Sequence, residues 1–257
     1  MTPSPVPESY VEYAPPPALR EYVECFWTRG AAPEIEARHH VIPDGCIDLL
    51  FTYDSLAASA GPASAMAVGT MTRPLSVEPA EVAAYVGVRF WPGRALPFLG
   101  VPAVAITDLS VAIADLWRPG DRHLVETQPT TLGGWREPFE RLLRARLQRA
   151  ESADRTVDAA VRAILRAGGN LSIAALAPAL GVTRQHLARV FARHVGVPPK
   201  MFARVTRVRK VLAKARVAST IDWTALALDA GYYDQAHLAG EVREITGRTP
   251  TEWLASN

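Results

Sequence analysis

The pattern of apolar and polar positions divides the chain into two parts with different periods. Up to about residue 125, short runs rich in Val, Ile and aromatic residues alternate with Pro, Gly and Ser, which is typical of β-strands and turns. Beyond residue 155, apolar residues recur every three or four positions, which indicates amphipathic helices. We therefore expect an α+β protein in which a mostly β amino-terminal domain with helices precedes an all-α domain.

The clearest strand signals are five short runs: ECFWT, HHVIP, CIDLLFTY, AMAVGT and AAYVGVRFW. After Pro92 the pattern turns helical through RALPFLG and LSVAIADLW. The segment EPFERLLRARLQRA, residues 137–150, places four apolar residues on one helical face: Phe139, Leu142, Leu143 and Leu147. We interpret it as a linker or dimerisation helix. The predicted division is a domain over 1–125, a linker over 126–154 and a second domain over 155–257.

The segment RHHVIPDGCIDLLF, residues 38–51, crowds polar side chains between two apolar runs. Pro43 has a fixed φ, Asp44 can accept a backbone hydrogen bond, and Gly45 can adopt a positive φ. These three residues together predict a tight turn. The simplest interpretation of the segment is a β-hairpin, with Cys46 packed as a small buried side chain.

The same segment contains five residues of metal-ligand type: His39, His40, Asp44, Cys46 and Asp48. Adjacent residues of a strand point to opposite faces, so the two histidines cannot both face one ion. A nucleophilic cysteine would need a base and an oxyanion site, which the spacing does not supply. We expect no metal site, no catalytic residue and no cofactor here. A metal- or thiol-sensing role for Cys46 stays open as the alternative.

Two segments of the carboxy-terminal part resemble each other, with one extra residue in the turn of the second copy. Leu176, Ala177, Gly181, Leu187, Phe191, Gly196 and Pro199 recur as Leu226, Ala227, Gly231, Leu238, Val242, Gly247 and Pro250. Each copy is predicted to form a short helix, a Gly-containing turn and a second helix. This is the plan of a helix-turn-helix.

Each predicted second helix has a cap, a buried side and an outward polar side. Thr183 and Asp234 precede these helices and can cap them. The outward positions are Arg184, Gln185, Ala188 and Arg189 in the first copy, and Gln235, Ala236, Ala239 and Arg243 in the second, with His237 near the rim. Arg and Gln at the amino end of a helix suit base edges and phosphates. A plain helical hairpin is the alternative, but a duplicated unit in a basic region favours DNA binding.

A basic helix is predicted between the two copies. Pro198 and Pro199 would end one helix and start the next. Apolar residues then recur at helical spacing to about residue 216, among five basic residues: Arg204, Arg207, Arg209, Lys210 and Lys214. A connecting helix of this kind could hold the two helix-turn-helix units about 34 Å apart, which is the spacing of successive major grooves on one face of DNA.

Charge is distributed unequally along the chain. Residues 155–257 carry 15 basic and 7 acidic residues, a net charge of +8, whereas residues 1–154 carry 13 and 19, a net charge of −6. The basic part should therefore face an anionic partner, such as double-stranded DNA. Two cysteines are too few for a disulfide scaffold, and there is neither a signal-peptide pattern nor a membrane-spanning run. We expect a cytoplasmic protein that does not bind membranes.

The two copies, the helix between them and the closing GYYDQAHLAGEVREITGRTPTEW resemble the DNA-binding domain of the AraC/XylS transcription regulators. The resemblance covers about residues 156–253. It implies helix-turn-helix units over about 172–195 and 222–246, with a connecting helix over about 199–216. It also implies base reading by Arg184, Gln185 and Arg189 in the first copy and by Gln235, Ala236 and His237 in the second. The full set of predicted DNA contacts adds Thr183, Arg193, Lys210 and Arg243.

Three residues depart from the pattern of that family. Gly240 stands where a polar or basic contact residue is frequent, and Val242 stands where Phe is usual. Pro178 lies inside the first helix of the first copy, where it removes a backbone hydrogen bond. The first two departures predict that the second unit reads fewer bases than the first.

VIPDGCIDLLF and VGVRFWPGRALPFLGVPA resemble the sensor domain that precedes the DNA-binding domain in a bacterial, especially actinobacterial, branch of these regulators. By analogy with the wider family, we expect a small cupin-like β-barrel with helices that binds an effector or forms a dimer. Arg89 and Arg94, with Trp91 between them, could clamp an anionic or aromatic effector. Surface ion pairs are the alternative for both arginines.

These observations predict a sequence-specific DNA-binding transcription regulator, controlled by a small-molecule effector and without enzymatic activity. RNA polymerase and a second copy of the chain would be further partners. The other alternative is a barrel enzyme fused to a DNA-binding domain. Its metal site would need two or three histidines at strand spacing, which the 6 scattered histidines do not offer.

Overall fold

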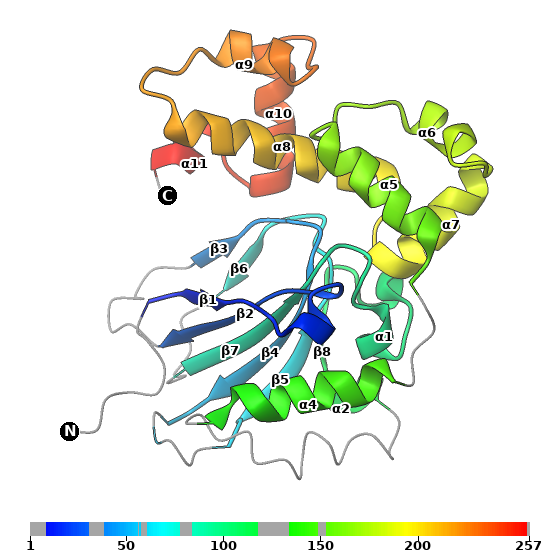
Figure 1. The fold of residues 1–257 in the computed structure, drawn as a ribbon. Coiled ribbons are helices and arrows are strands. Elements are labelled where there is room, and N and C mark those ends of the chain that lie inside the picture. The colour runs from blue at the N-terminus through cyan, green and yellow to red at the C-terminus, as the bar shows by residue number, and fades with distance from the viewer. Residues whose placement is uncertain are drawn as a thin grey trace.

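The computed structural model describes residues 9–30, 39–55, 57, 61–77, 84–117, 134–148 and 153–255. A β-rich amino-terminal part is followed by a helical carboxy-terminal part, which lies across one end of the sheet (Figure 1). The predicted α+β class is therefore confirmed. Within the described ranges, no helix is both long and apolar enough to cross a membrane.

The strands that the structure describes form two antiparallel sheets. The larger has the order β1 (Val11–Tyr13), β2 (Val23–Gly30), β7 (Ala84–Phe90), β4 (Ile47–Tyr53), β5 (Ser64–Val68) and β8 (Ser110–Ala112). The smaller pairs β3 (His39–Val41) with β6 (Leu75–Val77). Among the strands that the structure describes, no pairing joins β1 to β8 into a closed barrel.

The Pro43–Asp44–Gly45 turn does not close a β-hairpin. β3 pairs with β6, whereas both edges of β4 are taken by β5 and β7. The turn itself forms as predicted, because Asp44 Oδ1 accepts a hydrogen bond of 2.8 Å from the Cys46 amide and Gly45 has a φ of +83°. The hairpin prediction was wrong because local turn chemistry reverses the chain without deciding which strand the next segment pairs with.

The core of the amino-terminal part lies between the large sheet and a helix. Alternate residues of β4 are buried, as a strand with one covered face requires: Ile47, Leu49, Phe51 and Tyr53. Helix α4 (Arg136–Leu147) covers this face with Phe139, Leu142 and Leu143 (Figure 1). The helix interpreted as a linker or dimerisation helix therefore belongs to the amino-terminal core, because its apolar face is already covered by the sheet.

The described residues of the amino-terminal part include four further short helical segments. These are η1 (Pro17–Leu19), α1 (Leu96–Leu99), η2 (Ala103–Ile106) and α2 (Ile113–Leu116). The predicted helical segments after Pro92 thus occur as short turns of helix, interrupted by β8. Strands β1, β6 and β8 have three residues each and were missed, because so short a run carries too little periodicity to be recognised.

The carboxy-terminal part is entirely helical in its described residues. Its elements are α5 (Arg155–Arg166), α6 (Ile173–Ala179), α7 (Arg184–Val195), α8 (Pro199–Val217), α9 (Trp223–Asp229), α10 (Gln235–Thr246) and α11 (Pro250–Ala255). They pack around two cores. Helix α8 contributes to both, with Phe202 in the first core and Val205, Val208, Val211 and Leu212 in the second. The same helix therefore holds both helix-turn-helix units.

Candidate nucleic-acid interface and sensor site

The first helix-turn-helix unit consists of α6, a turn at Gly181 and α7. Gly181 has a φ of +71°, which only glycine adopts without strain. Thr183 Oγ1 then accepts a hydrogen bond of 3.1 Å from the His186 amide and so caps α7. The buried side of α7 carries Leu187, Val190 and Phe191, and its exposed side carries Arg184, Gln185, Arg189 and Arg193.

Pro178 does not break the first unit. Helix α6 extends through it to Ala179, and the Leu180 amide still donates to the carbonyl of Leu176. The carbonyl that Pro178 leaves without an amide donor is that of Ala174, and both residues are exposed, so water can reach it. The proline therefore removes one backbone hydrogen bond from α6 without distorting the turn that follows.

The second unit repeats this geometry with α9, a turn at Gly231 and α10. Asp234 Oδ1 accepts a hydrogen bond of 2.7 Å from the His237 amide and caps α10. Four predicted contact residues are exposed on this helix: Gln235, Ala236, His237 and Arg243. Gly240 is also exposed, and a Cβ at this position would meet no atom within 4 Å. Both units therefore present their predicted DNA contacts to solvent, while DNA contact itself stays a prediction.

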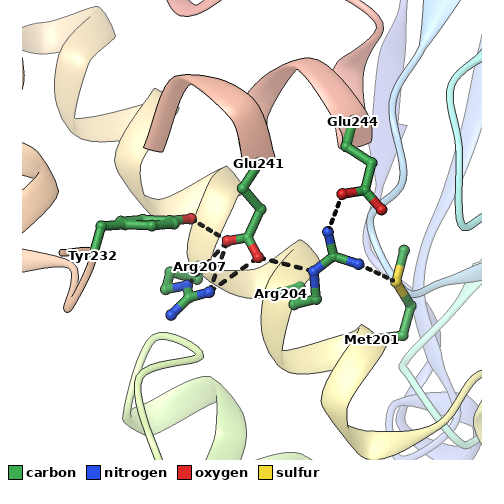
Figure 2. Close-up of polar contacts among 6 residues, drawn as sticks. All are labelled: Met201, Arg204, Arg207, Tyr232, Glu241 and Glu244. Atoms are coloured by element: carbon green, nitrogen blue, oxygen red, sulfur yellow. Dashed lines mark hydrogen bonds and ion pairs between the residues drawn. The ribbon is translucent and has the colours of Figure 1, made fainter. Parts of the chain in front are cut away.

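The connecting helix presents less free positive charge than its sequence indicates. Arg204 and Arg207 turn toward Glu241 on α10 (Figure 2). Lys214 is paired with Asp229 of α9. Lys210 stays exposed, with its aliphatic chain against Gly168, where a Cβ would lie 2.3 Å from Lys210 Cδ. Of the basic residues on α8, Lys210 therefore fits a phosphate contact better than Arg204, Arg207 or Lys214.

The structure places further residues beside α7 and α10 that the sequence pattern did not single out. Arg155 and His194 line a shallow groove together with Arg189 and Arg193, where the start of α5 meets α7. Tyr233 lies directly before the cap of α10 with 86% of its surface exposed. An aromatic residue beside a predicted cap was the signal for Tyr233, whereas only tertiary contact brings Arg155 to α7.

Two of the three predicted effector residues, Trp91 and Arg94, contact the same segment, residues 20–22, whereas Arg89 lies apart from them. Both ends of the Arg94 guanidinium are engaged, with Glu21 at 2.9 Å and with Asp158 of α5 at 2.8 Å. Trp91 donates its indole N–H to the carbonyl of Arg20 at 3.2 Å. Within the described part of the chain, these residues share no partner with Arg89. The predicted clamp is therefore not assembled, and Arg94 instead links the amino-terminal part to α5.

Arg89 lies in a row of charged side chains that crosses the large sheet. Its Nε lies 3.3 Å from Asp48 Oδ1 and 3.8 Å from Asp44 Oδ2, yet this buried atom makes no hydrogen bond in the described structure. Asp48 also accepts a hydrogen bond of 3.0 Å from the indole N–H of Trp27. Burial raises the pKa of Asp48 to about 6, although Arg89 opposes the shift. Arg89 is thus ion-paired with two aspartates while its buried Nε stays without a hydrogen bond among the described residues.

Cys46 is buried under the same charged row. Its Sγ lies 3.7 Å from Glu24 Oε2, and burial raises the pKa of its thiol well above the usual value, with the nearby carboxylates adding to the effect. A thiol with a raised pKa is rarely the reactive thiolate, so the environment favours a structural role. Among the described residues, no group of three or more side chains is arranged to hold a metal ion.

The amino-terminal part contacts the first helix-turn-helix unit directly. Thr70 Oγ1 donates to the carbonyl of Val195, and Thr107 Oγ1 donates to that of Gly196 at 2.5 Å, at the carboxyl end of α7. Gly45 lies against Phe202 of α8, where a Cβ would be only 2.3 Å from Phe202 Cε2. Loops of the amino-terminal part therefore contact both the carboxyl end of α7 and the connecting helix α8.

Comparison with known proteins agrees with this architecture. A sequence model described as a helix-turn-helix domain matches residues 176–256, and one described as a domain of unknown function (DUF6597) matches residues 11–112. No curated protein matches the chain.

Two solved proteins illustrate the structural similarity. One is a transcriptional regulator described as AraC-type from Chromobacterium violaceum, with 22% identity, coverage of 39% of this chain and 90% of that chain, and a TM-score of 0.36. The other is ToxT from Vibrio cholerae, with 11% identity, coverage of 90% and 98%, and a TM-score of 0.43.

The carboxy-terminal part is a helix-turn-helix domain, which confirms the two predicted helix-turn-helix units. The amino-terminal part matches a domain family without an assigned function over residues 11–112.

Proposed function

We propose that this chain is an AraC-type DNA-binding transcription regulator that reads a specific DNA sequence with both helix-turn-helix units. The exposed side chains of α7 support this, because Arg184, Gln185 and Arg189 follow the cap at Thr183, as base and phosphate contacts require. The second unit offers shorter side chains at Ala236 and Gly240. We therefore also propose that the bases under the first unit are specified more strictly.

We further propose that a small-molecule effector bound to the amino-terminal domain controls DNA binding. The observation that carries this proposal is the contact of Thr70 and Thr107 with the last carbonyls of α7. Any effector that shifts these loops changes the support of a recognition helix. Arg89 is the best of the three predicted effector residues, because its buried Nε has no hydrogen bond among the described residues.

Sequence reading is tested by selecting DNA sites with the full-length protein and measuring affinity by fluorescence anisotropy. Arg184→Ala or Arg189→Ala should weaken the selected site by about 1–3 kcal/mol and relax the preference at one position. Arg141→Ala on α4 removes the same charge from the amino-terminal part and serves as the control. Equal binding of all DNA sequences by the wild-type protein would refute sequence-specific reading.

Effector control is tested by screening small anionic and aromatic compounds for a thermal shift of the wild-type protein. A true effector should lose its shift with Arg89→Gln and should change operator affinity in the wild-type protein. Thr107→Val should retain the thermal shift but reduce the change in operator affinity, because it removes the hydrogen bond to Gly196. If the effector changes operator affinity equally in Thr107→Val and in the wild type, the hydrogen bond between Thr107 and Gly196 does not transmit the effect.

Two further partners belong to the proposal. A regulator bound beside a promoter would contact RNA polymerase, and a second copy of the chain would double the DNA contacts. The apolar face of α4 is covered by the sheet, so a dimer would have to use another surface. Sedimentation of the protein with and without its selected DNA would measure the number of copies.

A further inference from the structure

Glu241 is a buried acid in the middle of the second recognition helix. Only 7% of its surface is exposed, and three side chains donate hydrogen bonds to its carboxylate (Figure 2). Tyr232 donates its hydroxyl at 2.5 Å, Arg204 donates Nε at 2.8 Å, and Arg207 donates Nη2 at 2.8 and 3.0 Å and Nε at 3.2 Å. Burial alone would raise the pKa of Glu241, but these donors together hold it below its usual value.

This network joins three elements of the second unit. Arg204 and Arg207 come from α8, Tyr232 from the turn and Glu241 from α10 (Figure 2). Arg204 also pairs with Glu244 at 2.5 Å. A buried carboxylate opposite two guanidinium groups has few alternative positions, because hydrogen bonds between charged groups are directional. The rotation of α10 about its axis is therefore defined by the network as well as by apolar packing.

The network also reaches a predicted reading residue. The ring of Tyr232 meets the ring of His237 edge to face at 5.3 Å, while the Arg207 guanidinium lies 4.2 Å from the centre of the Tyr232 ring. His237 is exposed and follows the cap of α10. Glu241 lies one helical turn after His237, beside the same tyrosine. Displacing Tyr232 would therefore alter both the tilt of α10 and the placement of His237.

We propose that Glu241 is a positioning residue for DNA reading, which holds α10 and the His237 ring in the orientation required by the second half of the binding site. It does not touch DNA itself. A consequence is that Arg204 and Arg207 serve this orientation and do not neutralise phosphates. This inference rests on the proposed sequence-specific reading by both units.

The test uses the full-length protein and its selected site, together with a second DNA in which the half under the second unit is scrambled. Glu241→Gln should bind the full site about tenfold more weakly, which corresponds to about 1.4 kcal/mol. It should bind the half-scrambled DNA as the wild type does, because the first unit is unchanged. That second measurement also verifies that the variant is folded.

Two matched variants sharpen the result. Glu244→Gln removes the exposed partner of the same Arg204, 62% of whose side chain is accessible, and should leave both affinities within about twofold. Tyr232→Phe removes one hydroxyl, keeps the ring, and should weaken the full site less than Glu241→Gln does. It should also relax the base preference nearest His237.

The outcomes separate this inference from the proposed function. If the wild-type protein shows no preference for the full site over the scrambled one, reading by the second unit fails. If the wild type shows the preference and Glu241→Gln keeps it, positioning by Glu241 is overturned. Equal weakening of both DNAs by Glu241→Gln and by Tyr232→Phe would also overturn it, since that result indicates a general loss of folded protein.

Discussion

The two helix-turn-helix units share one backbone plan but are held together by different interactions. Where the second unit has Tyr232 and Glu241, the matched positions of the first are Val182 and Val190. Val190 lies in an apolar core, whereas Glu241 lies in an ionic network. At the next position the first unit has the larger residue, since the buried Phe191 corresponds to the buried Val242.

This difference shows how a duplicated unit can keep its geometry after its core has changed. The burial of apolar side chains stabilises the fold in proportion to the area buried, and it tolerates small rotations of a helix. A buried carboxylate that pairs with arginines adds little net free energy of folding, because its desolvation offsets much of the attraction, but it specifies one orientation of the helix. The first unit is in addition tied to the amino-terminal domain at Thr70, Thr107 and Gly45, so its position depends on that domain.

The largest expected effect separates the two cores. Phe191→Ala should lower the free energy of unfolding by about 3–5 kcal/mol, because the ring is fully buried near Phe202. Val242→Ala, at the matched position, should cost only about 2–3 kcal/mol, because less area is lost. Urea unfolding monitored by circular dichroism measures both. Equal losses would mean that the two units rely on apolar packing to the same extent.

The contact between the first unit and the turn at residues 43–45 of the amino-terminal domain is tested at Gly45. Gly45→Val should cost about 2–3 kcal/mol, because valine resists the positive φ and its Cβ would displace Phe202. Gly61→Val, where a Cβ meets no atom within 4 Å, is the control and should change stability by no more than about 0.5 kcal/mol. Similar melting temperatures for the two variants would show that the turn does not bear on α8.

Acid should loosen the second unit before the first. The folded pKa of Glu241 is lowered, so its contribution is complete above the unfolded value of about 4.3 and is lost as pH falls through the folded value. Glu241→Gln should therefore be less stable than wild type by about 2 kcal/mol at pH 7, the size of a hydrogen bond to a charged group. Unfolding curves between pH 7 and pH 3 should show this gap closing. A gap that is constant with pH would contradict the ionic role of Glu241.

The smallest expected effects are equal in the two units. Thr183→Ala and Asp234→Ala each remove a hydrogen bond to the amide three residues later, and each should cost about 1 kcal/mol. Hydrogen exchange of the first-turn amides of α7 and α10 measures the local loss. A markedly larger loss at Asp234 would indicate that its charge, and not only the cap, supports α10.

Local signals in the sequence predicted the helices of the carboxy-terminal part and their exposed faces. The glycine turns, the capping residues and the apolar spacing act over a few neighbouring residues, so a short stretch of sequence is enough to show them. In α7, for example, the cap at Thr183 and the apolar spacing of Leu187 and Phe191 predict the helix and its buried side. The same holds for the turn at Gly45, whose positive φ and Asp44 hydrogen bond follow from residue type alone. These features need no knowledge of distant segments.

Tertiary structure decided which charged side chains are free. Arg94, Arg204 and Arg207 look alike in sequence to Arg184 and Arg189, but their acidic partners lie between 34 and 73 residues away along the chain. It also decided that the turn at Gly45 meets Phe202 and that α4 covers the sheet. Such contacts depend on how separate elements pack, and no local periodicity encodes them. Sequence alone therefore determines the two helix-turn-helix units of this protein, while only the folded chain determines which contacts hold them in place.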